Sequence, residues 1–154
     1  MIMGSEGRDE QTLISDQDNA LIYEDLSDPA DALKALEYFN RYSELTCNQL
    51  NRAGFKFCDG DNMAKNPKWC QPLSVWKQYF TNWIRSVDPQ KILYSSIFFD
   101  FRGAWGDLSL TDELKDHLSK SVKEWPGILR CLTENSFQFK PPISFFGNFI
   151  VEEK

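Results

Sequence analysis

The chain has 154 residues, a length that fits one domain or two very small ones. Its net charge of −6 and isoelectric point near 4.8 argue against general binding to DNA, RNA or anionic membranes, which relies on a basic surface. No apolar run reaches the roughly 18 residues that predict a transmembrane helix, and the N-terminus lacks the pattern of a secretory signal. We therefore expect a cytoplasmic protein.

The cysteines favour free thiols over a metal site. Cys47, Cys58, Cys70 and Cys131 are widely spaced, no CxxC pair occurs, and His117 is the only histidine. A zinc site would need three or four of these cysteines at irregular spacing. Free thiols in a reducing compartment are the simpler interpretation.

The first elements along the chain are short strands. Residues 1–3 predict the end of a buried strand that runs into Gly4, and the polar segment after it has room for one helical turn. The apolar run "NALIY" at 19–23 predicts a second strand, and the alternating "FKF" at 55–57 predicts a third.

A long helix is predicted between the second and third strands. Asp28 has the character of an N-cap, Pro29 fits the first helical position, and Gly54 follows the expected end near Ala53. One buried stripe is expected at Ala32, Leu36, Phe39, Ser43, Cys47 and Leu50. Residues 1–66 thus predict a short mixed sheet with a helix.

Residues 67–154 predict a helical bundle. A helix opened by Pro72 would bury an apolar face, and a second Asp-Pro start occurs at Asp88. The buried face of the first of these helices would carry Leu73, Trp76, Phe80 and Trp83. We expect core packing for Trp69, Trp76 and Trp83, with base stacking as the lesser alternative.

Two further helices are predicted after residue 108. The segment 109–125 spaces Leu114, Leu118 and Val122 at steps of four, and Ser109 with Asp112 could form a capping box. Another helix is expected in 126–137, followed by the apolar tail "PPISFFGNF". The predicted fold class is α+β: a small mixed sheet with a helix, then a helical bundle.

Asp16 and Asp18 are the first candidate functional residues. Side chains two positions apart on a strand point to the same face, so the two carboxylates would repel each other without a cation or a shared proton. Mg²⁺ prefers such oxygen ligands and is commonly shared with substrate phosphates. Gly4 and Ser5 could offer backbone N–H groups and a hydroxyl to those phosphates, and Arg8 could add a charged contact.

Two other interpretations of this aspartate pair are simpler. Such triplets occur in many acidic loops as turn or cap chemistry. The pattern also resembles the start of a calcium loop, but Leu21 and Ser27 occupy the positions where that loop needs Gly and Glu.

Several motifs in order carry a resemblance to a known family. "GSEGRDEQTLISDQDNALIYED", "CDGDNMAKNPKW", "PLSVWKQYFTNWI", "SIFFDFR" and "PPISFFGNF" resemble a bacterial family of nucleotidyltransferases related to PII-protein uridylyltransferases. "GS" followed by "DQD" is similar to the signature of the superfamily that also includes DNA polymerase β and kanamycin nucleotidyltransferase. Family members commonly carry N-terminal cyclic-nucleotide-binding and CBS domains and a helical substrate-binding-like domain after the transferase core.

The resemblance implies a function and roles for particular residues. The protein would transfer a nucleoside monophosphate from a nucleoside triphosphate to a hydroxyl of an unknown acceptor, with a protein as one option, in signalling. Gly4 and Ser5 would hold the triphosphate, Asp16 and Asp18 would ligate one or two Mg²⁺ ions, and Arg8 would contact phosphate.

The resemblance also implies a third carboxylate from a later strand. Asp59 and Asp61 are the candidates, and turn chemistry beside Gly60 is the competing interpretation of both. Asp100 and Arg102 in "FFDFR" could line the site between the two domains or form a structural ion pair or cap. Asp107 could cap the next helix, and His117, expected on the polar side of its helix, is not a candidate base.

The chain resembles a truncated family member, with 1–66 a partial nucleotidyltransferase core and 67–154 a helical domain cut at its C-terminus. The family's regulatory domains are absent from this chain, and an incomplete sheet would favour self-association. Two alternatives to an active enzyme follow: a catalytically inactive nucleotide-sensing module, and a helical interaction domain with a vestigial N-terminal part.

Overall fold

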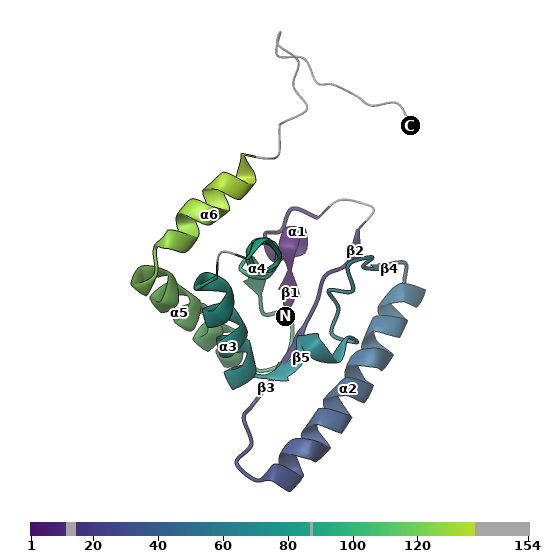
Figure 1. The fold of residues 1–154 in the computed structure, drawn as a ribbon. Coiled ribbons are helices and arrows are strands. Elements are labelled where there is room, and N and C mark those ends of the chain that lie inside the picture. Colours follow the sequence, from purple (N-terminus) through teal and green to yellow (C-terminus); the bar gives the residue numbers. More distant parts are fainter. Residues whose placement is uncertain (12–14, 87, 138–154) are drawn as a thin grey trace, which may run out of the picture.

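The computed structural model describes residues 1–11, 15–86 and 88–137; the "PPISFFGNF" motif lies outside them. The fold is α+β, as predicted. Helix α2 (Pro29–Arg52) lies on one side of a set of short strands, and the helices of the C-terminal half lie on the other side (Figure 1). Within the described ranges, no helix is long and apolar enough to cross a membrane.

The N-terminal half follows the predicted order with one addition. Its elements are β1 (Ile2–Met3), α1 (Gly4–Gly7), β2 (Asp16–Gln17), β3 (Leu21–Tyr23), α2 and β4 (Lys56–Phe57). The additional strand is β2, which carries the first of the two aspartates. Its polar sequence lacks the apolar signal of a strand, so only pairing with β4 defines it.

Helix α2 begins and ends where local sequence signals place it. The Asp28 carboxylate accepts a hydrogen bond from the N–H of Ala30 at 2.7 Å, and Pro29 occupies the first helical position. The helix ends at Arg52, before Gly54, whose φ of 107° suits glycine. The predicted stripe faces inward, with Ser43 and Cys47 fully buried.

The C-terminal half is helical, as predicted. Its elements are a 3-10 turn η1 (Pro67–Trp69), β5 (Cys70–Pro72), α3 (Leu73–Ile84), α4 (Pro89–Phe98), β6 (Phe101–Arg102), α5 (Ser109–Glu124) and α6 (Gly127–Ser136). Asp88 caps α4 through the N–H of Gln90. The predicted capping box at Ser109 is wrong, because Ser109 is already the first helical residue. Asp107 instead accepts a hydrogen bond from its N–H at 2.9 Å.

Three short strand pairs connect the chain. β2 pairs with β4 in parallel, β3 pairs with β5 in parallel, and β1 pairs with β6 antiparallel. The last two pairs join the N-terminal 66 residues to the C-terminal half. The predicted domain boundary at residues 66 and 67 is therefore crossed by backbone hydrogen bonds.

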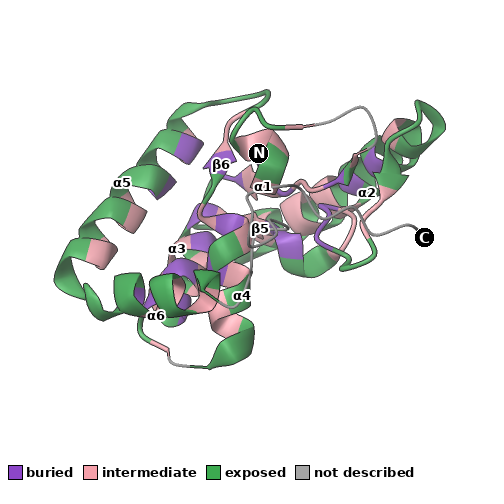
Figure 2. Cartoon of the chain, turned by 90° about the horizontal axis from the view of Figure 1, so that it is seen from above, coloured by how far each residue is buried: buried purple, intermediate pink, exposed green. Residues whose placement is uncertain are grey.

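One aromatic core lies between the two halves. Met3 and Ala20 of the N-terminal half belong to the same buried cluster as Trp69, Trp76 and Phe98. Figure 2 shows buried residues on α3 and on the sides of neighbouring elements that face it, while the outer faces of α5 and α2 are largely exposed. Core packing of the three tryptophans is confirmed, since none is more than 5% exposed.

Candidate functional site

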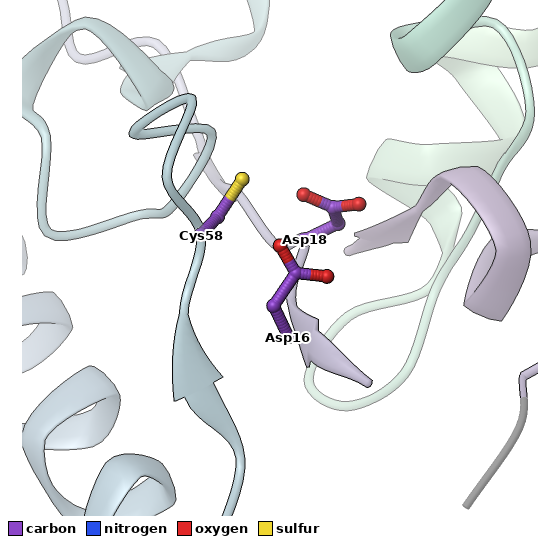
Figure 3. A group of neighbouring side chains, drawn as sticks. All are labelled: Asp16, Asp18 and Cys58. Atoms are coloured by element: carbon purple, nitrogen blue, oxygen red, sulfur yellow. The ribbon is translucent and has the colours of Figure 1, made fainter. Parts of the chain in front are cut away.

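Asp16, Asp18 and Cys58 converge on one point. One ligand atom from each lies within 4.8 Å of the others, and the two carboxylates and the sulfur point into the same region (Figure 3). Among the described residues, these three side chains form the one group of acidic and thiol side chains close enough together to hold a metal ion.

The register of β2 and β4 explains why Cys58 joins the aspartates. Asp16 lies opposite Lys56, and Gln17 lies opposite Phe57. The residues that directly follow the two parallel strands, Asp18 and Cys58, therefore lie next to each other. The alternation of the strand puts both aspartates on one face. Sequence reasoning missed Cys58, and only the pairing of the polar segment 16–18 with 56–58 reveals it.

Gln17 points away from the aspartates and anchors the strand to α2. Its side chain is 3% exposed, and its Nε2 donates hydrogen bonds to the carbonyls of Cys47 at 3.0 Å and Phe55 at 2.8 Å. The strand that carries Asp16 and Asp18 is thereby fixed against the end of the helix.

The electrostatic environment disfavours charge at this point in the absence of a cation. Burial raises the pKa of Asp18, and the charges of Asp16 and Glu6 raise it further, while a hydrogen bond from the Cys58 thiol opposes the shift. Burial also raises the pKa of Cys58 to about 11, with Asp18 contributing to the rise. The thiol is therefore protonated at neutral pH.

Gly4 brings the backbone of α1 against Asp18. Its φ is 61°, and a Cβ there would lie 3.3 Å from the Asp18 carboxylate oxygen Oδ2. The N–H of Met3 donates to the carbonyl of Asp18 at 3.0 Å, while the N–H of Gly4 donates to the carbonyl of Asp100 at 3.0 Å. Ser5 is exposed. The Gly4–Ser5 turn and the aspartate pair are therefore neighbours.

Arg8, Asp100 and Arg102 hold the end of α1 to β6. Arg8 forms ion pairs with Asp100 and Glu10, each at 2.7 Å, and these two carboxylates raise the pKa of its guanidinium. Arg102 pairs with Asp9 at 3.0 Å. Asp100 and Arg102 thus form ion pairs with Arg8 and Asp9, which directly follow α1. A phosphate that binds Arg8 would have to displace one of its two carboxylate partners.

Asp59 and Asp61 lie outside the cluster of Asp16, Asp18 and Cys58. Asp59 is exposed, and Asp61 has a φ of 54° in the turn. The Asp61 carboxylate accepts a hydrogen bond from Asn66 at 2.8 Å, and its carbonyl accepts one from Trp69 Nε1 at 2.9 Å. These contacts are turn chemistry, the competing interpretation in the sequence.

His117 differs from its predicted position. It is half-buried against α3, where its Nε2 lies 2.9 Å from the hydroxyl of Thr81 and 3.1 Å from the carbonyl of Lys77. The imidazole therefore joins α5 to α3 and is not among the residues of the aspartate site.

A cleft of about 840 Å³ begins at Asp16 and Asp18. Its walls come from β2, β3, the inner face of α2 and residues 104–107 before α5. Its volume is within the range of ligand sites in proteins. The aspartate pair therefore lies at an open space large enough for a substrate.

The aspartate pair fits a hard divalent cation. Asp16 is exposed and Asp18 is half-buried, and a metal bound between them would relieve their repulsion. Mg²⁺ commonly uses one or two carboxylates while water and phosphate oxygens complete its shell. The protonated Cys58 thiol is a poor ligand for such a cation. Asp16 and Asp18 would hold the ion, with Cys58 beside them.

Comparison with known proteins gives one family. The model of the family described as "Putative nucleotidyltransferase DUF294" matches residues 1–90, more than half of the chain. This range contains the Gly4–Ser5 turn, the aspartate pair and Cys58. No curated protein and no solved structure matches the chain significantly.

Proposed function

The chain belongs to the putative nucleotidyltransferase family DUF294, and from this premise we propose a Mg²⁺-dependent transfer of a nucleoside monophosphate from a nucleoside triphosphate to a hydroxyl group. A uridylyl-type transfer to a protein acceptor is the form that we propose to test first. The observation that carries the proposal is the close approach of Gly4 to the Asp18 carboxylate, which a Cβ at Gly4 would meet at 3.3 Å.

The proposed reaction is an in-line displacement at the α-phosphorus. The acceptor oxygen forms a bond to that phosphorus, the bond to the bridging oxygen breaks, and pyrophosphate leaves with the electron pair. The hydroxyl proton passes to a carboxylate of the site or to water. Bound Mg²⁺ would neutralise charge on the phosphates and orient the attacking and leaving oxygens.

The chain's own residues have distinct proposed roles. Asp16 and Asp18 provide the metal's carboxylate oxygens, the exposed Ser5 hydroxyl donates to a phosphate oxygen, and Gly4 allows the close approach of the backbone. Arg8 reaches phosphate after releasing Glu10 or Asp100. The structure supports these roles by proximity.

Calorimetry with the nucleotide tests the proposal. Wild-type chain should bind UTP in the presence of Mg²⁺ and lose that affinity when EDTA is added. The double variant Asp16→Asn with Asp18→Asn should lose it as well. A matched control, Asp59→Asn with Asp116→Asn, makes the same change in net charge at two exposed positions outside the cluster and should bind normally. Equal affinity of the wild type and the first double variant would refute the assignment.

A second function, nucleotide sensing without transfer, is favoured by one observation. Cys58 lies beside the aspartates where a third carboxylate could complete a two-metal site, and its thiol is protonated. Incubation with labelled UTP and a lysate separates the two functions, since a labelled acceptor supports transfer and saturable binding alone supports sensing. If a carboxylate is what the site lacks, Cys58→Asp should tighten Mg²⁺ binding and Cys58→Ser should not.

A further inference from the structure

The cleft beside the aspartates is lined by negative charge. The charged side chains among its described lining residues are Glu6, Asp16, Asp18, Glu24 and Asp107. No lysine, arginine or histidine of the described residues contributes to its walls. Arg8 and Arg102 lie outside the lining, where Arg8 pairs with Asp100 and Arg102 pairs with Asp9. The charge of the cleft therefore favours a cationic ligand.

Aromatic side chains lie along the same cleft. Tyr38 and Tyr42 of α2 stack with ring centroids 6.5 Å apart and are 64% and 40% exposed, and Trp105, also in the lining, is 84% exposed. Exposed aromatic rings in a concave surface are typical anchors for a partner. Beside carboxylates, they also favour ammonium and guanidinium groups.

We propose that the acceptor in the proposed transfer is a positively charged segment of polypeptide, bound in this cleft with its hydroxyl beside Asp16 and Asp18. The inference rests on the proposed function for the identity of the reacting group. A polypeptide brings together the three features that the cleft would recognise: basic side chains for its carboxylates, apolar side chains for its aromatic residues, and a serine, threonine or tyrosine hydroxyl. A simple polyamine offers only the first.

Two synthetic peptides of equal length test the charge preference. In one, two lysines flank a serine and a phenylalanine, and in the other, glutamates replace the lysines. Fluorescence anisotropy at low ionic strength should show at least tenfold tighter binding of the lysine peptide. Spermine is the third probe, and it should compete weakly because it has neither the hydroxyl nor the aromatic ring.

Matched variants separate the cleft from the overall charge of the chain. Glu24→Gln with Asp107→Asn should weaken binding of the lysine peptide at least fivefold, and the asparagine keeps an oxygen that can accept the hydrogen bond from the N–H of Ser109. Asp116→Asn with Glu124→Gln changes the net charge equally on the exposed side of α5 and should leave binding intact. Trp105→Ala should weaken binding, whereas Trp125→Ala, an exposed tryptophan outside the lining, should not.

Each outcome bears on the inference separately from the proposed function. The proposal of a cationic acceptor would be refuted by any of three results. These are equal binding of the two peptides, no binding of either peptide, and equal losses of binding in both charge variants. Competition by spermine as strong as by the lysine peptide would overturn the assignment to polypeptide. Calorimetry with Mg²⁺ and UTP on the same wild-type preparation reports the proposed function independently, so nucleotide binding without peptide binding refutes only the inference drawn here.

Discussion

At the scale of single residues, the carboxylate of Asp18 is in an environment that disfavours its charged form. It is half-buried beside Asp16 and Glu6, and burial raises its pKa because the charged form is poorly solvated there. Its neighbour Gly4 has no side chain to separate it from the backbone of α1. A cation bound at the proposed metal site would offset this electrostatic cost.

Substitution of Asp18 should therefore stabilise the metal-free chain. Asp18→Asn is expected to raise the free energy of unfolding by about 0.5–1 kcal/mol, since it removes a desolvated charge close to another carboxylate. Urea unfolding in EDTA measures the change. Asp59→Asn, at an exposed position outside the cluster, is the control and should change stability by less than about 0.5 kcal/mol. A loss of stability in Asp18→Asn would contradict the electrostatic account.

Metal binding should depend on pH through the same carboxyl. Because the pKa of Asp18 is raised in the folded state, its protonated form persists to higher pH and competes with the cation. Mg²⁺ affinity should fall as the pH drops through this raised pKa, by about tenfold per pH unit below it. Without metal the sign reverses for stability: the contribution of Asp18 is fully present below its ordinary pKa and is lost as pH rises through the raised one.

Titrations of Mg²⁺ by calorimetry at several pH values measure this dependence. Thermal unfolding in EDTA over the same pH range should show that the wild type loses stability with rising pH relative to Asp18→Asn. A Mg²⁺ affinity that is constant down to pH 4 would show that Asp18 is not a ligand.

At the scale of elements, α1 depends on an unusually close approach to the end of α4 and β6. A Cβ at Gly7 would overlap the carbonyl carbon and oxygen of Asp100, and the N–H of Gly4 donates to the same carbonyl. Glycine is needed here for space, since the φ of Gly7 is not positive. The position of the Gly4–Ser5 turn thus depends on Asp100 in the other half of the chain as well as on the hydrogen bond from Met3 to Asp18.

Gly7→Ala should displace α1 from Asp100. The expected cost is about 1–3 kcal/mol, because backbone atoms cannot move aside as a flexible side chain would. Mg²⁺-dependent nucleotide binding should weaken with it. Gly127→Ala is the control, since a Cβ there would meet only Trp125 Nε1 at an ordinary 4.0 Å and alanine favours the helix; its stability should be unchanged or slightly higher. Equal effects of the two substitutions would contradict the proposed role of the close approach.

The elements that sequence predicted best are those with local causes. The two Asp-Pro starts at Asp28 and Asp88, and the apolar stripe of α2, depend only on neighbours along the chain. Strand β2 and the partner of Asp18 depend on pairing across 40 residues of sequence, from Asp16 to Lys56, which no local pattern encodes. The aspartate pair was therefore predictable as a candidate site, while Cys58 was not.

At the scale of the whole molecule, one core joins the two predicted parts. Met3 is fully buried in the same cluster as Trp76 and Phe98, and β3 pairs with β5 across the predicted boundary. Composition placed the small sheet and the helices correctly in order. It could not show that the C-terminal half contributes the strands β5 and β6 that pair with β3 and β1, and the aromatic rings that pack against them.

The shared core predicts a single unfolding transition. Far-ultraviolet circular dichroism, dominated by helices, and fluorescence of the buried Trp69, Trp76 and Trp83 should give the same midpoint in urea. Trp76→Phe should lower both midpoints together, because the substitution removes volume from the common cluster. Two separated transitions, one lost on substitution and one kept, would show that residues 1–66 and 67–154 fold independently.

The antiparallel pair of β1 with β6 has a consequence for the order of folding. Ile2 lies opposite Arg102, so this pair closes a loop that includes most of the described chain. Closing so long a loop costs conformational entropy, and the contacts that offset this cost form only after the intervening elements have folded. The Gly4–Ser5 turn takes its place against Asp100 through the same pairing. During synthesis, residues 1–3 can pair with residues 18–20 early, through the hydrogen bond from Met3 to Asp18, but the contact of Gly4 with Asp100 can form only after β6 has left the ribosome.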